Sequence, residues 1–208
     1  MPAPTYVYCD AALLVIDKPA GFLAVPGRGA DKQDCALVRV QRDHPEALLV
    51  HRLDMATSGL MVFARSPAIQ RMLARAFAER AVGKHYTAVV HGRPEPAAGV
   101  IDLPIGADWP NRPRRRIDPV DGRPSRTHFR TLSYDATHET TRVDLTPETG
   151  RTHQLRLHMQ ALGHPIVGDP LYGDPSSGAP RLLLHATILR LRHPLDGGTI
   201  EFRSPPPF

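Results

Sequence analysis

Apolar residues in this chain gather mostly in short runs separated by turn residues, which is the pattern of β-strands. The run 13–17 ends in a Lys-Pro-Ala-Gly turn, and the run 59–64 is apolar throughout, as expected of a strand buried on both faces. Segments 84–92, 127–134 and 141–146 alternate apolar and polar residues and are also predicted as strands, as are 182–191 and 199–202. The pattern further predicts that the second and third of these segments pair, and that the last two form a hairpin around Asp-Gly-Gly at 196–198.

Helical spacing is confined to three segments. Residues 31–43 show it weakly, whereas the apolar residues between 69 and 77 follow it clearly behind a Ser-Pro cap, up to about residue 80. A further helix is predicted to open at Gly150-Arg151-Thr152 and to end at Gly163. Many strands, few helices and no regular strand–helix alternation predict an α+β fold with a mixed, largely antiparallel β-sheet.

Length and composition bound the class of protein. A chain of 208 residues, 41% of them hydrophobic, suits one globular domain or two small lobes that share a core, and we expect a single domain over residues 1–208. No run approaches the roughly 18 apolar residues of a membrane span, and the first residues lack the pattern of a secretory signal. Cys9 and Cys35 have no metal-ligand spacing, so free thiols in a reducing compartment are expected. These features predict a cytoplasmic protein without membrane contact.

Basic residues exceed acidic ones, giving a net charge of +5 and an isoelectric point of about 9.6. The window 109–130 holds seven arginines and two aspartates, so its own net charge equals that of the whole chain. A cluster of this kind suits a polyanionic partner such as a nucleic acid. On charge alone, a solvated surface without any partner explains the window equally well.

Three further segments contain the residue types that carry chemistry. Segment 51–59, His-Arg-Leu-Asp-Met-Ala-Thr-Ser-Gly, joins two apolar strands, where a scaffold commonly presents functional side chains. Taken alone, it is equally consistent with a charged turn. Segment 150–158 has the pattern of an amphipathic helix with a polar face rich in Arg and His, and 182–186 that of an ordinary core strand. None of the three decides a function by itself.

In combination, these segments resemble the RluA-type family of pseudouridine synthases. HRLDxxTSG at 51–59 matches that family's signature, and GRTHQLRxH at 150–158 matches its second motif. Weaker elements follow in the family's order: KPAG at 18–21, Lys84 with Tyr86, GHPIVGDPLYG at 163–173 and LLLHA at 182–186. The resemblance extends over residues 6–208. It implies the pseudouridine synthase fold, a single catalytic α+β domain with an active-site cleft across the sheet and without an S4 RNA-binding domain.

The resemblance implies an enzyme that isomerises uridine, breaking the N1–C1′ bond and joining C5 to C1′. Nothing is oxidised or hydrolysed overall, so no cofactor is expected, and one carboxylate is needed as nucleophile or base. The family assigns that role to Asp54, without deciding whether it attacks C6 or C1′ or removes the C2′ proton. Burial in a dry pocket raises the pKa of a carboxyl, and a nearby guanidinium opposes that shift. The family assigns this second role to Arg151.

The target uridine has to leave its stack, at a cost that is lowest in unpaired loops. By the resemblance, Tyr86 lies against the uracil, Leu184 belongs to the apolar wall of the base pocket, and Arg52 fills the vacated space. An ordinary strand residue is the alternative interpretation of Tyr86, and core packing describes Leu184 equally well. The arginine window is expected to follow RNA phosphates. The predicted RNA-binding residues are Arg52, Arg112, Arg114, Arg115 and Arg116.

Other classes of protein stay open at this point. An RNA-binding or RNA-folding chaperone without catalysis would have no need of Asp54, Tyr86 and Arg151 together. A hydrolase would need two placed carboxylates, or a nucleophile such as Ser58 beside His51. A metal enzyme would need a ligand spacing that the 11 histidines do not show, so no metal is expected.

Substrate and assembly are less constrained. Within the family, Asp-Trp-Pro-Asn-Arg-Pro at 108–113 and the lack of an S4 domain favour a member that modifies a 23S rRNA hairpin and a tRNA anticodon loop. A member that acts on another tRNA position is the main alternative. We expect a monomer that binds structured RNA and has no obligate protein partner.

Overall fold

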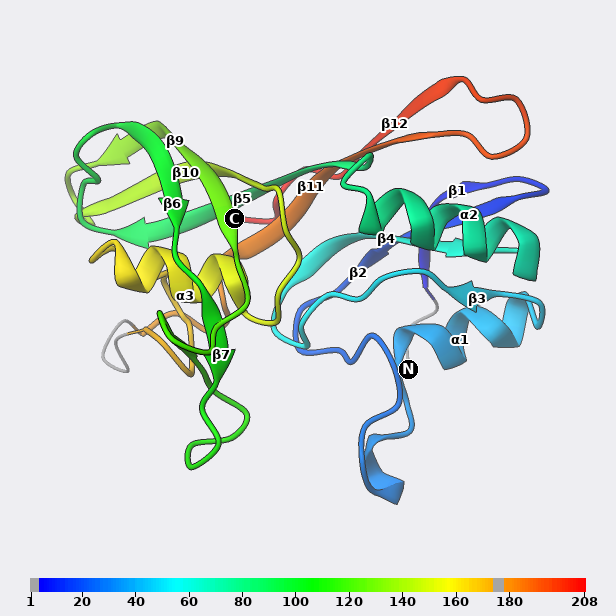
Figure 1. The fold of residues 1–208 in the computed structure, drawn as a ribbon, viewed down its shortest axis with the longest axis horizontal. Coiled ribbons are helices and arrows are strands. Elements are labelled where there is room, and N and C mark those ends of the chain that lie inside the picture. The colour runs from blue at the N-terminus through cyan, green and yellow to red at the C-terminus, as the bar shows by residue number, and fades with distance from the viewer. Residues whose placement is uncertain (1–3, 174–177) are drawn as a thin grey trace. The chain divides into compact units, whose positions relative to one another are not determined.

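A computed structural model describes residues 4–173 and 178–208. The chain divides into two compact units (Figure 1). Unit 1 comprises the residues up to Lys84 together with His185–Pro207, and unit 2 comprises His85–Leu184 with the last residue, Phe208. Among the described helices, none has the length and apolar character needed to cross a bilayer.

Unit 1 is built on a sheet with β4 at its centre. Its strands are β1 (Thr5–Cys9), β2 (Leu13–Lys18), β3 (Leu48–Leu49), β4 (Ser58–Ala64), β11 (Leu184–Arg192) and β12 (Thr199–Arg203). β2 pairs antiparallel along β4 and carries β1 on its other edge. β3 pairs antiparallel with the end of β4, and β11 pairs parallel with its start. β12 returns antiparallel along β11, which confirms the predicted hairpin. The parallel pair of β4 and β11 among antiparallel pairs makes the sheet a mixed one.

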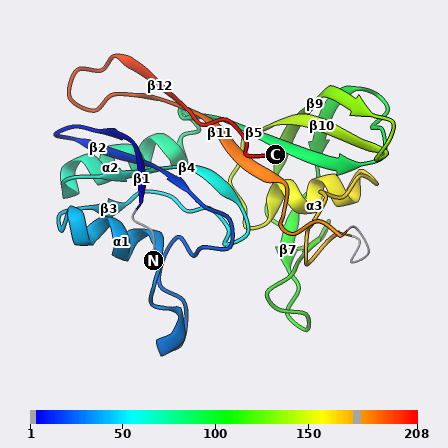
Figure 2. The same ribbon diagram turned by 180° about the vertical axis from the view of Figure 1, so that it is seen from behind.

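Two helices accompany this sheet, α1 (Ala36–Asp43) and α2 (Pro67–Ala78). The predicted cap of α2 is present, since the Ser66 hydroxyl accepts the main-chain N–H of Ile69 at 3.3 Å. In both views of the fold α2 runs along β4 (Figures 1 and 2). Its buried residues join the apolar side chains of β2, β4 and β11 in one core. The weak helical pattern over 31–43 yields a helix only in its second half, after a short 3-10 turn at Ala30–Lys32.

Unit 2 holds an antiparallel sheet in the order β5-β10-β9-β6 and a separate β7–β8 ribbon. The strands are β5 (Gly83–His91), β6 (Ala98–Asp102), β7 (Ile105–Ala107), β8 (Arg115–Ile117), β9 (Arg126–Asp135) and β10 (Thr140–Pro147). The predicted pairing of the two central segments is confirmed, with Leu145 of β10 opposite Phe129 of β9. Burial along β10 alternates with every second residue, so this strand has one buried and one partly exposed face.

The helix of unit 2, α3 (Gln154–Ala161), starts later than its sequence predicts. Residues 150–152 do not open it. They form a turn, and His153 takes a left-handed conformation (φ 59°). The first helical bond runs from the N–H of Leu157 to the carbonyl of His153. The cause is the side chain of Gln154, whose Oε1 accepts the main-chain N–H of Arg151 at 3.0 Å and holds the preceding residues in the turn.

Candidate active site

Asp54 lies in the loop 50–57, which connects β3 to β4 in unit 1. A turn closes this loop, because the N–H of Thr57 donates to the carbonyl of Asp54 at 3.1 Å. Leu53 is buried in the interior, whereas Arg52 is exposed and Asp54 is half-buried. The loop therefore has an apolar anchor between the two charged side chains that the sequence singled out.

A buried ammonium group holds the same loop. Lys18 is fully buried, and its Nζ donates to the carbonyls of Pro19 at 2.9 Å, Phe22 at 2.7 Å and Met55 at 3.2 Å. A lysine is rarely buried to this degree unless its charge is well bonded. Because Met55 follows Asp54 directly, this contact fixes the main chain beside the carboxylate. The KPAG motif, read from the sequence as a turn, thus also supports the loop of the signature motif.

Ser58, the first residue of β4, begins a chain of buried polar side chains. Its Oγ lies 2.8 Å from Nδ1 of His185, and Nε2 of His185 lies 3.0 Å from Oγ of Ser204. The Ser204 hydroxyl donates to Asp17 at 2.6 Å. In a neutral His185 ring, Nε2 donates to Ser204 and Nδ1 accepts from Ser58. This chain ties the end of the Asp54 loop to β11, to β2 and to the segment after β12.

His51 stands at the start of the signature motif. Its ring stacks on Phe77 with centroids 4.6 Å apart, and its Nε2 accepts the main-chain N–H of Val62 at 3.1 Å. Burial, with the charge of Lys84 as a second cause, lowers the pKa of His51 to about 3. The basic nitrogen is already engaged by the main chain, so His51 is not placed to act as a base for Ser58. The hydrolase reading of these two residues therefore has no support in the structure.

Gly59 has a structural reason for its place in the signature. It adopts φ 110°, in the region that side-chain-bearing residues avoid. A Cβ at this position would also overlap the main chain of Ala186, the residue that pairs with Gly59 across β4 and β11. A glycine is needed here for β11 to approach the strand that follows the Asp54 loop.

Arg151 lies in unit 2, in the turn before α3, and is half-buried. Its main-chain N–H donates to the side chain of Gln154, and its Nε donates to the carbonyl of Pro124 at 3.3 Å. Arg151 is thus held at two points, by the first residue of α3 and by the segment before β9. One point is the main-chain N–H, and the other is Nε, the guanidinium nitrogen nearest to the main chain.

Tyr86 and Leu184 are also placed within the elements predicted for them. Tyr86 is half-buried on β5, opposite Leu145 of β10. Leu184 is buried, at 3% exposure, and is the first residue of β11. Of the three predicted catalytic residues, Asp54 belongs to unit 1, and Tyr86 and Arg151 belong to unit 2.

The tip of the β7–β8 ribbon, residues 108–114, carries two of the predicted RNA-binding arginines. Arg112 and Arg114 are both exposed. The guanidinium of Arg112 lies 3.9 Å from the ring centre of Trp109, which is itself 67% exposed. A cation over an exposed aromatic ring presents both charge and a flat surface to a partner.

Arg115 and Arg116 lie on β8 and are less available to a ligand than Arg112 and Arg114. The main-chain N–H of Arg115 donates to the hydroxyl of Tyr172 at 2.7 Å, which fastens the ribbon to the GHPIVGDPLYG segment. Arg116 forms an ion pair with Asp118 at 2.9 Å. The main-chain N–H of Asp121 and this guanidinium lower the pKa of Asp118, so the aspartate is charged and offsets Arg116 at neutral pH. The four arginines therefore differ in the charge that they offer to a ligand.

Within residues 4–173 and 178–208, no three His, Cys, Asp or Glu side chains are grouped so as to hold a metal ion. Residues 12–161, most of the chain, match the family model of the RNA pseudouridylate synthases. The chain belongs to the RNA pseudouridylate synthase family. The synthase therefore carries the fold and the isomerase activity that its motifs predict: it forms pseudouridine in RNA.

Known relatives of the synthase extend over nearly its whole length. The dual-specificity RNA pseudouridine synthase RluA of Escherichia coli (strain K12) is 48% identical over 204 residues, covering 97% of this chain and 93% of that protein. RluA of Haemophilus influenzae is 48% identical over 200 residues, covering 95% and 91%. Among solved structures, human RNA pseudouridylate synthase domain containing 1 matches with a TM-score of 0.82 at 31% identity, covering 99% of this chain and 84% of that chain. The predicted α+β pseudouridine synthase fold is thus confirmed.

Several supporting residues of the synthase were not found by sequence reasoning. Lys18 and Gln154 lie inside quoted motifs, yet no role was predicted for either side chain. Asp17 and Ser204 lie outside the signature and second motifs. The available signal is general: a polar side chain that is buried, as that of Gln154 is, has to be bonded.

Proposed function

We propose that the synthase modifies a uridine in a 23S rRNA hairpin and one in a tRNA anticodon loop. The observation that carries this proposal is the 48% identity, over nearly the full length of both proteins, to relatives named as dual-specificity enzymes. The Asp-Trp-Pro-Asn-Arg-Pro segment supports it as well, because it forms the exposed tip of the β7–β8 ribbon, available to an RNA loop. The enzyme is proposed to act in the cytoplasm as a monomer.

Asp54 is proposed as the catalytic carboxylate, attacking C6 or C1′ or removing the C2′ proton. The reaction breaks N1–C1′ and forms C5–C1′. One proton leaves C5 and one is gained at N1, so the composition of the nucleoside is unchanged and no oxidant or reductant enters. Arg151 is proposed to keep the carboxylate charged, and Tyr86 to stack on the uracil and help move the C5 proton. Leu184 is proposed as part of the apolar wall around the base, and Arg52 as the residue that fills the vacated stack.

The test uses unmodified total RNA incubated with the synthase, followed by chemical mapping of pseudouridine. One modified uridine in 23S rRNA and one in a tRNA anticodon loop are expected. Asp54→Asn should form none at either site, and Arg151→Met should be crippled while still binding RNA. Modification at other tRNA positions alone would refute the substrate proposal. Wild-type rates in Asp54→Asn would refute the assigned carboxylate.

The β7–β8 ribbon is proposed to contact RNA phosphates, with Arg112 and Arg114 contributing more than Arg116. Each phosphate contact that is lost should reduce the salt dependence of binding by about one unit of slope. We therefore expect Arg114→Gln to flatten the dependence of log Kd on log salt, and Arg116→Gln to change it less, because Asp118 already offsets its charge. Arg75→Gln on α2, paired with Glu79, is the control. Equal slopes for Arg114→Gln and the control would rule out the ribbon contact.

A further inference from the structure

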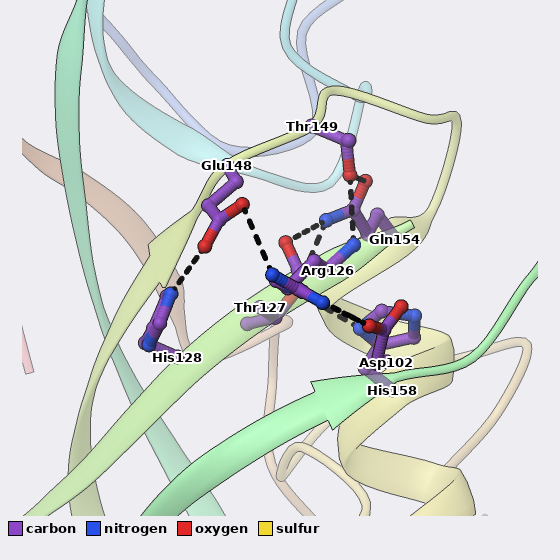
Figure 3. A network of polar contacts seen from close by, with 8 residues as sticks. All are labelled: Asp102, Arg126, Thr127, His128, Glu148, Thr149, Gln154 and His158. Carbon is purple, nitrogen blue, oxygen red and sulfur yellow. Dashed lines mark hydrogen bonds and ion pairs between the residues drawn. The ribbon is translucent and has the colours of Figure 1, made fainter. Parts of the chain in front are cut away.

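Gln154 is almost fully buried, at 4% exposure, and both ends of its side-chain amide are bonded (Figure 3). Its Oε1 lies 3.0 Å from the main-chain nitrogen of Arg151 and 2.7 Å from the hydroxyl of Thr149. Its Nε2 lies 3.0 Å from the carbonyl of Arg126 and 3.0 Å from the hydroxyl of Thr127. The amide thus joins the loop before α3 to the first residues of β9.

The orientation of this amide is fixed by main-chain groups. A main-chain N–H can only donate, so the end that faces Arg151 has to be the oxygen. A main-chain carbonyl can only accept, so the end that faces Arg126 has to be the nitrogen. Nε2 then donates its second hydrogen to the hydroxyl oxygen of Thr127. Thr149 donates its hydrogen to Oε1, while its oxygen accepts the N–H of Arg126 at 3.0 Å.

The chain continues to His158 on α3. Its Nε2 lies 3.0 Å from the carbonyl of Leu103, so this nitrogen carries a hydrogen and donates it. Its Nδ1 lies 2.9 Å from the hydroxyl of Thr127, whose oxygen already accepts from Gln154. Burial lowers the pKa of His158, so the ring is neutral and Thr127 donates to Nδ1. Every bond from Leu103 to Arg151 runs in one determined direction.

We propose that Gln154 is a positioning residue for Arg151 in the pseudouridine reaction. This inference rests on the role proposed above for Arg151. Gln154 fixes the main-chain N–H of Arg151, and Pro124 accepts from its Nε, so the direction in which the guanidinium leaves the main chain is set. The Gln154 amide is bonded in turn to Thr127, and Thr127 is bonded to His158. A small displacement of a catalytic group is enough to slow a reaction strongly, by about 100-fold for 1 Å.

Neither methionine nor glutamate meets these requirements at position 154. Methionine has a similar length but neither donor nor acceptor, so the N–H of Arg151 and the carbonyl of Arg126 would lose their partner. Glutamate would place an acceptor against the carbonyl of Arg126 and a negative charge in a buried site. The exposed ion pair between Arg126 and Asp102, at 2.5 Å, adds little to this arrangement because it is solvated (Figure 3).

The first measurement compares Gln154→Met with Gln160→Met, the same change at an exposed position of the same helix. We expect Gln154→Met to lower the single-turnover rate of pseudouridine formation by about 10- to 100-fold. The Kd for RNA should stay at the wild-type value, and Gln160→Met should match the wild type in both. A loss of RNA affinity with an unchanged single-turnover rate would overturn the proposal.

The second measurement is a double-mutant cycle with Arg151→Met. If Gln154 acts through Arg151, adding Gln154→Met to Arg151→Met should lower the rate no further. Independent, multiplying losses would overturn the inference while leaving the role of Arg151 intact. A wild-type rate in Arg151→Met would instead remove the role of Arg151, and with it this inference, without affecting the activity of the synthase.

A readout independent of turnover covers variants that are too slow to assay. The amide of Arg151 should exchange with solvent faster in Gln154→Met than in wild type, while the amide of Leu157, bonded to His153, keeps its protection. If Gln154→Met fails to fold, Thr149→Val removes the hydroxyl bonds to Oε1 and to the N–H of Arg126, and Thr149→Ser keeps both. Loss of rate in Thr149→Val with recovery in Thr149→Ser supports the proposal. Equal rates in these two variants contradict it.

Discussion

The loops that carry Asp54 and Arg151 present their charged residues in different ways. The Asp54 loop of unit 1 is held by groups far away in the sequence, and two of them are charged types. Lys18 donates to the carbonyl of Met55, and the chain from Ser58 ends on Asp17. The Arg151 loop of unit 2 is held by a neutral amide only three residues away. One loop thus depends on a buried charge, and the other on a neutral network that begins three residues away and extends to the first residues of β9.

This difference follows from what each loop has to stabilise. In unit 1 three carbonyls converge on one point, and an ammonium group with three hydrogens satisfies all of them. In unit 2 the groups to be satisfied include both donors and acceptors, namely the N–H of Arg151 and the carbonyl of Arg126. An amide provides one of each. The Lys18 ammonium and the Gln154 amide are therefore not interchangeable, and their removal should have different effects on the protein.

The largest effect is expected from Lys18→Met. Methionine fits the volume of the lysine stem but cannot donate to the carbonyls of Pro19, Phe22 and Met55, and each group left unsatisfied costs about 1–3 kcal/mol. We expect the free energy of unfolding, measured by urea titration, to fall by about 3 kcal/mol or more. Gln154→Met removes only hydrogen bonds of a neutral side chain, so it should lower the free energy of unfolding by less.

Lys32→Met is the matched control, since Lys32 is exposed. It should leave the free energy of unfolding near the wild-type value. If Lys18→Met is no less stable than this control, buried charge does not support the Asp54 loop, and the contrast between the two loops disappears.

The same contrast explains what the sequence could and could not predict. Strands with a clear pattern, such as 59–64 and the hairpin around 196–198, were found because periodicity and turn residues encode them locally. β6 and β8 were missed, since they are short and rich in glycine or charge, and their existence depends on pairing with β9 and β7.

The residues of the candidate site likewise fall into those that the sequence predicted and those that it did not. Asp54 and Arg151 were identified from motifs, because residue type and spacing are visible in the sequence. The chain of His185, Ser204 and Asp17 was not, because its members meet only after β2, β4 and β11 have come together. The turn at 150–153 was taken for helix because the bond from Gln154 to the preceding main chain competes with the helical pattern.

A smaller effect, on pH dependence, tests whether both units rely on neutral histidines. Burial lowers the pKa of His158, and its bond to Leu103 and the charge of Asp102 offset this only in part. Burial likewise lowers the pKa of His51 in unit 1, to about 3. Both folded-state pKa values lie below the value of about 6.5 expected in the unfolded chain, so the unfolded state binds more protons in acid. The free energy of unfolding should have its full value above about pH 6.5 and should decrease as the pH falls below that value.

The measurement is the free energy of unfolding at pH 7.5 and 5.5 for wild type and His158→Gln. A glutamine can donate to the Leu103 carbonyl and accept from Thr127 without titrating, so this variant should lose less stability on acidification than wild type. His138→Gln, at an exposed histidine paired with Asp135, should not reduce the loss. An equal loss in wild type and His158→Gln would mean that the neutral network of unit 2 tolerates protonation. The acid sensitivity would then come from other groups, such as His51 in the Asp54 loop.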